Sequence, residues 1–176
     1  MKKILAFMLT MVLVVSLCGC MPASNNVPKV VTLEGVSSDD EAAVVYTSYK
    51  DSLRGVCEYM ADKGYIYDLP EATGDELTDP VKMDAAFIGA DEGYKFTYVF
   101  EEKSVTVEIY SFSKTDGAHY QQAKSEGKVT IAQDVQNGTV NAVLSGNGKY
   151  MMMYTDTANR TEREASATEA FKAFYK

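Results

Sequence analysis

The chain carries few side chains that could perform acid–base or nucleophilic chemistry. Its single histidine, His119, lies beside Tyr120 in a sequence with neither a G-x-S-x-G nor an S-x-x-K motif, so we expect a structural histidine. Cys57 falls at the edge of an apolar stripe, where a free cysteine is usually a small buried hydrophobe rather than a thiolate nucleophile. We therefore expect no catalytic residue and no enzymatic activity.

Carboxylates and methionines are the remaining candidate metal ligands. The acidic residues form four short runs, at 39–41, 75–79, 91–92 and 101–102. None has the alternating oxygen-ligand spacing and internal glycine of an EF-hand loop, and we interpret the 75–79 run as solvated charge rather than a weak calcium site. Met151, Met152 and Met153 are consecutive in a predicted strand, so they point to alternate faces and cannot converge on copper. We expect no metal and no other cofactor.

Tyrosine is the side chain best suited to recognition, with 12 copies in the chain. Tyr94 and Tyr98 share one face of a predicted strand, and Tyr110 and Tyr154 fall on predicted neighbouring strands. If helices cover only one face of the sheet, the other face could present these four tyrosines to a partner. The alternative places them at the rim of the core, and the sequence does not decide between the two.

The N-terminus has the pattern of an export signal. Lys2 and Lys3 precede an apolar run at 4–17, and the small Gly19 follows, which is typical of a secretory signal peptide rather than a transmembrane helix. The stretch Leu17-Cys18-Gly19-Cys20 resembles the lipobox of bacterial lipoproteins. The resemblance implies cleavage before Cys20 and a lipid on its thiol, although a plain secreted protein cleaved nearby is the alternative. We expect residues 1–19 to be the signal peptide and the protein to lie at the outer face of the cell membrane. In a Gram-negative host that would be the periplasm or the outer membrane.

Charge and cysteine usage extend this prediction. The full chain has a net charge of -8, and removal of the signal peptide leaves 15 basic against 25 acidic residues, a net charge of -10. Such an acidic protein is not expected to bind nucleic acid or an anionic bilayer surface, so its attachment would depend on the lipid. With Cys20 lipidated, Cys57 has no partner, and we expect no intramolecular disulfide.

Residues 20–38 are expected to form the lipidated N-terminus and a flexible tether, because prolines and small polar residues disfavour packed structure there. Part of this segment could instead pair as an edge strand. The single folded domain is expected at 39–176, and its 46% hydrophobic composition is sufficient for a core.

Periodicity predicts the elements that must position any site. An apolar stripe behind the capping box Ser38-Asp39-Asp40-Glu41 predicts a helix over 39–63, and a long surface loop follows at 64–86. Further segments are expected in the following order: strands at 94–100 and 105–110, a short helix at 116–127, strands at 129–135, 140–144 and 149–154, and a helix from Thr161 to Phe174. We place a hairpin turn at Asn137-Gly138.

These elements predict an α+β fold with the order α-β-β-α-β-β-β-α. We expect an antiparallel sheet of about five strands, with the N- and C-terminal helices packed on one face. The layout is similar to that of small α+β lipoproteins of Gram-positive bacteria without assigned activity. The segments that carry this resemblance are Asn147-Gly148-Lys149-Tyr150 and Ala170-Phe171-Lys172-Ala173-Phe174.

The resulting functional hypothesis is a membrane-tethered binding or interaction module. Its contact would be the sheet face or the 64–86 loop, and its partner another envelope protein or a small ligand. Two alternatives remain: a small envelope hydrolase that uses carboxylates, and an inhibitor or accessory subunit of another envelope protein. An enzyme predicts a deep polar cleft with two or more carboxylates of perturbed pKa, whereas an interaction module predicts an exposed aromatic patch.

Overall fold

The computed structural model describes residues 29–30, 44–66, 81–100, 103–132 and 137–176. For residues 29, 30, 81, 98–100, 132 and 137 it describes the backbone alone. The lipobox residues Leu17, Cys18, Gly19 and Cys20 lie outside these ranges, as does the capping box expected at Ser38. Among the described residues, no helix has the length and apolarity that a membrane span requires.

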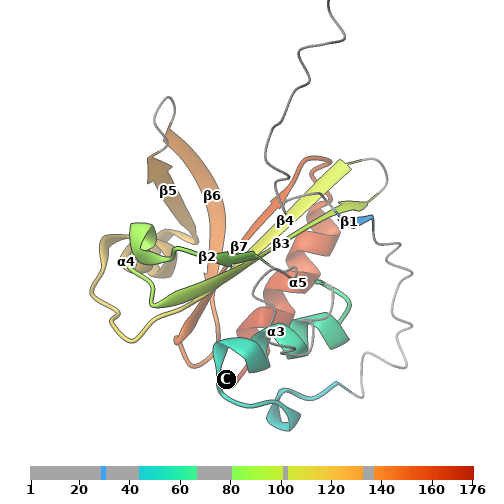
Figure 1. Ribbon diagram of the computed structural model, residues 1–176, viewed down its shortest axis with the longest axis horizontal. Coiled ribbons are helices and arrows are strands. Elements are labelled where there is room, and N and C mark those ends of the chain that lie inside the picture. The colour runs from blue at the N-terminus through green and yellow to red at the C-terminus, as the bar shows by residue number, and fades with distance from the viewer. Residues whose placement is uncertain (1–28, 31–43, 67–80, 101–102, 133–136) are drawn as a thin grey trace, which may run out of the picture.

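One seven-stranded sheet runs through the molecule, and the predicted α+β class is confirmed (Figure 1). Its strands are β1 (Lys29–Val30), β2 (Val81–Met83), β3 (Glu92–Phe100), β4 (Lys103–Ser111), β5 (Lys128–Ala132), β6 (Asn137–Leu144) and β7 (Tyr150–Asp156). The spatial order is β1-β3-β4-β7-β6-β5, and β2 also pairs with β3. All pairings are antiparallel except that of β1 with β3.

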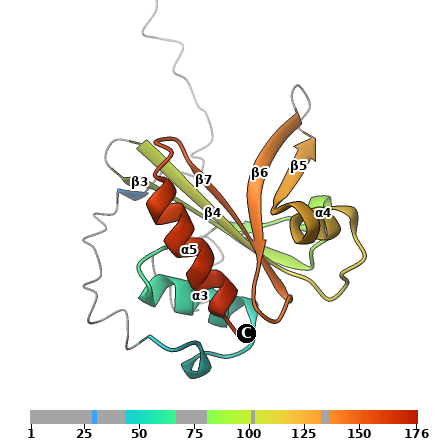
Figure 2. The ribbon, with the colours of Figure 1, turned by 180° about the vertical axis from the view of Figure 1, so that it is seen from behind.

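Helices cover both faces of the sheet. Helices α3 (Leu53–Asp62) and α5 (Thr161–Ala173) pack together on one face, as expected for the terminal helices (Figure 2). Helix α4 (Ala118–Glu126) and the short 3-10 turn η2 (Ala86–Ile88) pack on the other face. Each face therefore has its own buried cluster, and the sheet separates the two.

The methionine run follows the alternation that the sequence predicts for a strand. Met152 is buried in the cluster under α3 and α5, whereas Met151 and Met153 are buried in the cluster under α4. All three side chains are at most 1% exposed, so they serve as core residues of β7. Their divergence across the sheet agrees with the argument against a shared copper site.

The first predicted helix is too long. Residues 39–43 lie outside the described ranges, and the chain from 44 to 52 contains only the 3-10 turn η1 (Tyr46–Ser48). Helix α3 begins at Leu53, with Ser52 as its N-cap, where the Ser52 hydroxyl accepts a hydrogen bond from the Gly55 N–H at 3.0 Å. The preceding chain folds back so closely that a Cβ on Gly55 would lie 1.9 Å from the Lys50 carbonyl oxygen. Glycine at position 55 therefore allows a sharp entry that a continuous helix would not need.

The remaining elements agree with their predicted segments, with two corrections. The 64–86 segment was predicted to be loop throughout, but it contains β2, which pairs with β3 from Gly93 to Lys95. The turn predicted at Asn137-Gly138 is also wrong, because both residues lie inside β6, with Gly138 opposite Ile131. Strand β5 ends at Ala132 and β6 begins at Asn137, so the connection between them precedes the predicted turn and the register differs from the predicted one.

At residues 29 and 30, the chain pairs as an edge strand rather than forming part of a flexible tether. This pair forms β1, parallel to β3, with Lys29 opposite Tyr98 and Val30 opposite Val99. The edge of β3 is thus covered in two places, by β1 near one end and by β2 near the other. Strand β5 is the opposite edge of the sheet.

Candidate functional site

The four tyrosines proposed as a binding patch do not share an exposed face. Tyr110 is 0% exposed in the cluster under α4, and Tyr154 is 4% exposed in the cluster under α3 and α5. Tyr94 is half-buried against the α3–α5 side, and the side chain of Tyr98 lies outside the described residues. The prediction is therefore wrong for Tyr110 and Tyr154, because helices cover both faces of the sheet rather than one.

Tyr110 occupies its buried position through a contact with glycine. Its cross-strand partner is Gly93, and a Cβ built on Gly93 would lie 2.4 Å from a carbon of the Tyr110 ring. The Tyr110 hydroxyl donates to Glu108 at 2.9 Å. Burial raises the pKa of Tyr110, and the neighbouring Glu108 carboxylate adds to the effect. The ring is a core residue with no free surface for a partner.

Cys57 and His119, the candidate nucleophile and the candidate acid–base group, lie on helices that cover opposite faces of the sheet. Cys57 lies in α3 with 0% exposure, and burial raises the pKa of its thiol, so the thiolate is disfavoured. His119 is half-buried on α4, one residue before Tyr120, whose hydroxyl donates to the Gly148 carbonyl at 2.8 Å. In this part of the chain, no group of three or more His, Cys, Asp or Glu side chains is close enough to hold a metal ion.

A pocket of about 250 Å³ lies between α5 and strands β6 and β7; we call it the α5–β6 pocket. Its lining residues are Gly127, Asn141, Ala142, Val143, Met152, Tyr154, Glu164, Thr168 and Lys172. The strands place Tyr154 opposite Asn141 and Met152 opposite Val143, so these four side chains lie on the sheet face that α5 covers. Tyr154, buried and therefore not a surface platform, forms part of the pocket wall.

Helix α5 contributes a polar row to this pocket. Glu164, Thr168 and Lys172 are spaced four residues apart, so they lie on one helix face along about 12 Å of the helix axis. Across the pocket mouth, the Asn141 side-chain amide donates to Glu164 at 2.6 Å. Lys172 pairs with Glu169 at 3.0 Å, and both side chains are largely exposed. The arrangement gives an apolar base with hydrogen-bonding groups and both signs of charge at its rim.

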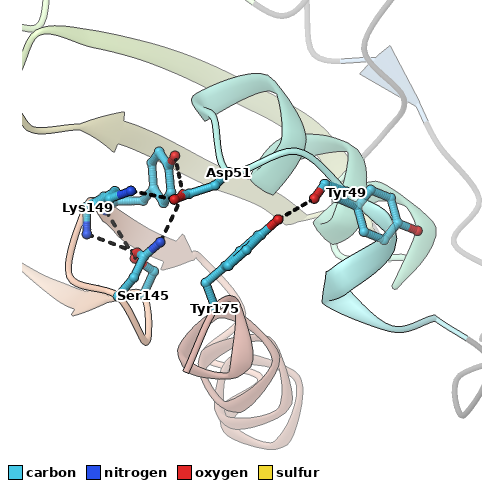
Figure 3. Close-up of polar contacts among 7 residues, drawn as sticks. Tyr49, Asp51, Ser145, Lys149 and Tyr175 are labelled. Carbon is cyan, nitrogen blue, oxygen red and sulfur yellow. Dashed lines mark hydrogen bonds and ion pairs between the residues drawn. The ribbon is translucent and has the colours of Figure 1, made fainter.

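A second polar cluster joins the start of α3 to the turn between β6 and β7 (Figure 3). Asp51 accepts hydrogen bonds from the Asn147 amide and the Tyr150 hydroxyl, each at 2.9 Å, and pairs with the Lys149 ammonium. The hydrogen bond from Lys149, together with those from Tyr150 and Asn147, lowers the pKa of Asp51, although burial opposes this shift. Each partner already has its bond within the cluster, so we interpret this Asp51 cluster as a structural connection.

Comparison with protein-family models, with characterised proteins and with solved structures found no match to this chain. Of the pocket residues, only Tyr154 was among the binding residues proposed from the sequence, and it was expected there as part of an exposed surface. The polar row on α5 was the available signal, since Glu164, Thr168 and Lys172 recur at helical spacing beside the buried stripe of Ala167, Phe171 and Phe174. Without knowledge of which strands lie beneath α5, that row resembles any solvated helix face.

Proposed function

We propose that this protein is a lipoprotein, anchored through Cys20 at the outer face of the cell membrane, whose folded domain binds a small polar ligand in the α5–β6 pocket. In a Gram-negative host, the corresponding place is the periplasm or the outer membrane. The anchor rests on the lipobox sequence, and the binding role rests on one observation, the pocket between α5 and β6. The proposal retains a binding module and replaces its tyrosine surface with this pocket.

The lining supports a ligand that is small and carries its own hydrogen-bonding groups. At about 250 Å³, the pocket lies just below the range of roughly 300–1,000 Å³ that suits drug-sized ligands. Val143 and Met152 offer apolar contact, while Asn141, Glu164 and Thr168 offer donors and acceptors. Glu164 and Lys172 carry opposite charges, which favours a neutral or dipolar molecule over a polyanion.

The position of β1 supports attachment near one end of the sheet. Lys29 follows Cys20 by nine residues, so the chain between them can span at most about 32 Å. Because Lys29 pairs with Tyr98, this end of β3 would lie within that distance of the lipid. Two or more acyl chains provide stable attachment, whereas the acidic domain itself is repelled by an anionic bilayer.

Intact-protein mass spectrometry of the membrane fraction tests the anchor. We expect a mature chain that begins at Cys20 with added acyl mass, and a Cys20→Ser variant that no longer partitions into detergent. An unmodified thiol at Cys20 in membrane-bound protein would contradict the anchor and leave the pocket hypothesis intact.

Methionine methyl spectra test the pocket. Met152 lines the pocket, while Met151 and Met153 lie across the sheet and serve as internal references. In titrations with free amino acids, dipeptides and monosaccharides, we expect at least one probe to shift the Met152 methyl resonance selectively.

A pair of variants shows whether that shift arises in the pocket. Thr168→Phe fills the pocket and should abolish the shift, while Ser166→Phe, at an exposed site on α5, should preserve it. Binding that is unaffected by Thr168→Phe, or no selective Met152 shift with any probe class, would reject this function for the pocket.

A further inference from the structure

The outer edge of β5 is an exposed strand edge with a side chain fixed across its centre. The Ala142 N–H donates to the Gly127 carbonyl at 3.0 Å, which fixes the alternation of the ladder. Residues 129 and 131 therefore direct their backbone groups toward β6, and residues 128, 130 and 132 direct theirs outward. Among the described residues, no strand pairs with this side of β5.

Gln122 of α4 occupies the central position of that edge. Its side-chain oxygen accepts the Thr130 N–H at 2.8 Å, and its amide nitrogen donates to the Thr130 hydroxyl at 3.1 Å. The primary amide thus makes the hydrogen bond that a neighbouring strand would make at Thr130. Exposed edges are common sites of unwanted strand pairing, and natural proteins often block them.

We propose that Gln122 caps the outer edge of β5 and thereby prevents this edge from pairing with a second copy of the chain. The inference rests on β5 and α4 alone and does not depend on the proposed ligand or lipid anchor. The association that Gln122 would block is that of two copies, because two β5 strands can pair about a twofold axis at the central Thr130.

The self-pairing has a defined register. Two antiparallel β5 strands related by a twofold axis at Thr130 place Thr130 opposite its own copy and Lys128 opposite Ala132. Threonine pairs are favourable across antiparallel strands, and this register sets no lysine directly against another lysine. The two central hydrogen bonds of the pair would both use the Thr130 N–H, which is the group that Gln122 occupies.

Strand β5 is also short enough that the Gln122 side chain alone can determine whether two copies associate. Five residues from each copy make an interface far below the roughly 1,200 Å² typical of stable complexes. Each copy also has a net charge of -8, or -10 without the signal peptide, and the copies repel each other at low salt. In the native protein, Gln122 occupies the Thr130 N–H, so the two central hydrogen bonds between copies cannot form. We therefore expect the native protein to be monomeric.

Sedimentation velocity over a micromolar-to-millimolar concentration series, in moderate salt, tests the proposal. Gln122→Ala frees the Thr130 N–H, and Gln122→Met does so while keeping the side-chain volume. The matched control is Gln121→Ala, because Gln121 is the preceding residue and its amide donates instead to the Thr115 carbonyl at 2.5 Å.

We expect both Gln122 variants to dimerise with a dissociation constant about tenfold or more below that of the wild type, while the Gln121→Ala variant behaves as the wild type. Thr130→Pro, which removes the outward N–H at an edge position that tolerates proline, should return Gln122→Ala to the monomer. Folded Gln122 variants that stay monomeric across the series, or a dimer that Thr130→Pro does not reverse, would overturn the proposal. If neither Gln122 variant folds, a Thr130 amide that exchanges with solvent in the wild type as fast as an exposed amide would also overturn it.

Discussion

Replacing Asp51 with alanine tests how much a contact between distant parts of the chain stabilises this domain. Asp51 immediately precedes the N-cap of α3, and its three partners lie in or beside the β6–β7 turn, at Asn147, Lys149 and Tyr150. The cluster therefore holds together segments almost one hundred residues apart in sequence. The Tyr175 hydroxyl adds a neighbouring connection, donating to the Tyr49 carbonyl at 2.7 Å (Figure 3).

The magnitude follows from how exposed each partner is. Tyr150 is 4% exposed, so its hydroxyl loses its partner in the variant, and a hydrogen bond to a charged group contributes about 1.5–3 kcal/mol. Lys149 has 57% side-chain exposure, so its ion pair contributes at most about 1 kcal/mol. With the Asn147 bond included, we expect Asp51→Ala to lower the free energy of unfolding by about 2–4 kcal/mol, which lowers Tm by roughly 6–12 °C.

Urea denaturation at neutral and acidic pH gives the measurement. The pKa of Asp51 is lowered in the folded state, so the contribution of its carboxylate is fully present above about pH 4 and is lost as the pH falls through the folded-state pKa. The difference in the free energy of unfolding between the wild type and Asp51→Ala should therefore become smaller on acidification. As a control, Lys149→Met should cost less than about 1 kcal/mol. A difference below about 0.5 kcal/mol at neutral pH, or one that is equally large in strong acid, would refute this reasoning.

Three further outcomes are expected. Gly93→Ala should displace the Tyr110 ring and lower the free energy of unfolding by about 1–3 kcal/mol in chemical denaturation, and Tyr110→Ala should largely remove that sensitivity; additive effects would contradict the contact. Cys57 should resist maleimide labelling in the native protein and react once urea unfolds it, as peptide mass spectrometry would show; rapid native labelling would contradict its burial. Arg160→Met removes the cation 2.7 Å from the buried Asp156 carboxylate and should lower the free energy of unfolding by about 2–3 kcal/mol by thermal denaturation, whereas a loss under about 0.5 kcal/mol would show the pair to be dispensable.

Local periodicity was sufficient to find most of the elements. The alternation around Tyr94 and Phe96 predicted β3, and the helical spacing of Ala167, Phe171 and Phe174 predicted α5. These predictions succeeded because hydrogen-bond geometry and side-chain direction repeat within a few residues. The export signal is likewise a local pattern, and its lipobox at Cys20 stays a prediction from the sequence.

The first helix and the tyrosine surface show where local patterns ended. The apolar spacing from Ala42 to Met60 suits a helix, yet the chain turns at Lys50, and the helix begins only after Ser52. Strand alternation placed alternate residues on opposite faces but contained no information about which face a helix would cover. Both faces are covered, so Tyr110 and Tyr154 became core residues on opposite sides of the sheet.

The sequence by itself determined most of the elements, their order and the α+β class, because each depends on interactions between residues near one another in the chain. Tertiary structure alone decided the α5–β6 pocket, the Asp51 cluster and the approach of Gln122 to the β5 edge. These features depend on the relative placement of separate elements, which the packing of the sheet between α3, α4 and α5 fixes as a whole. The contacts that a residue makes with other elements depend on how the sheet and all of its helices pack together, so no single segment of sequence encodes these contacts.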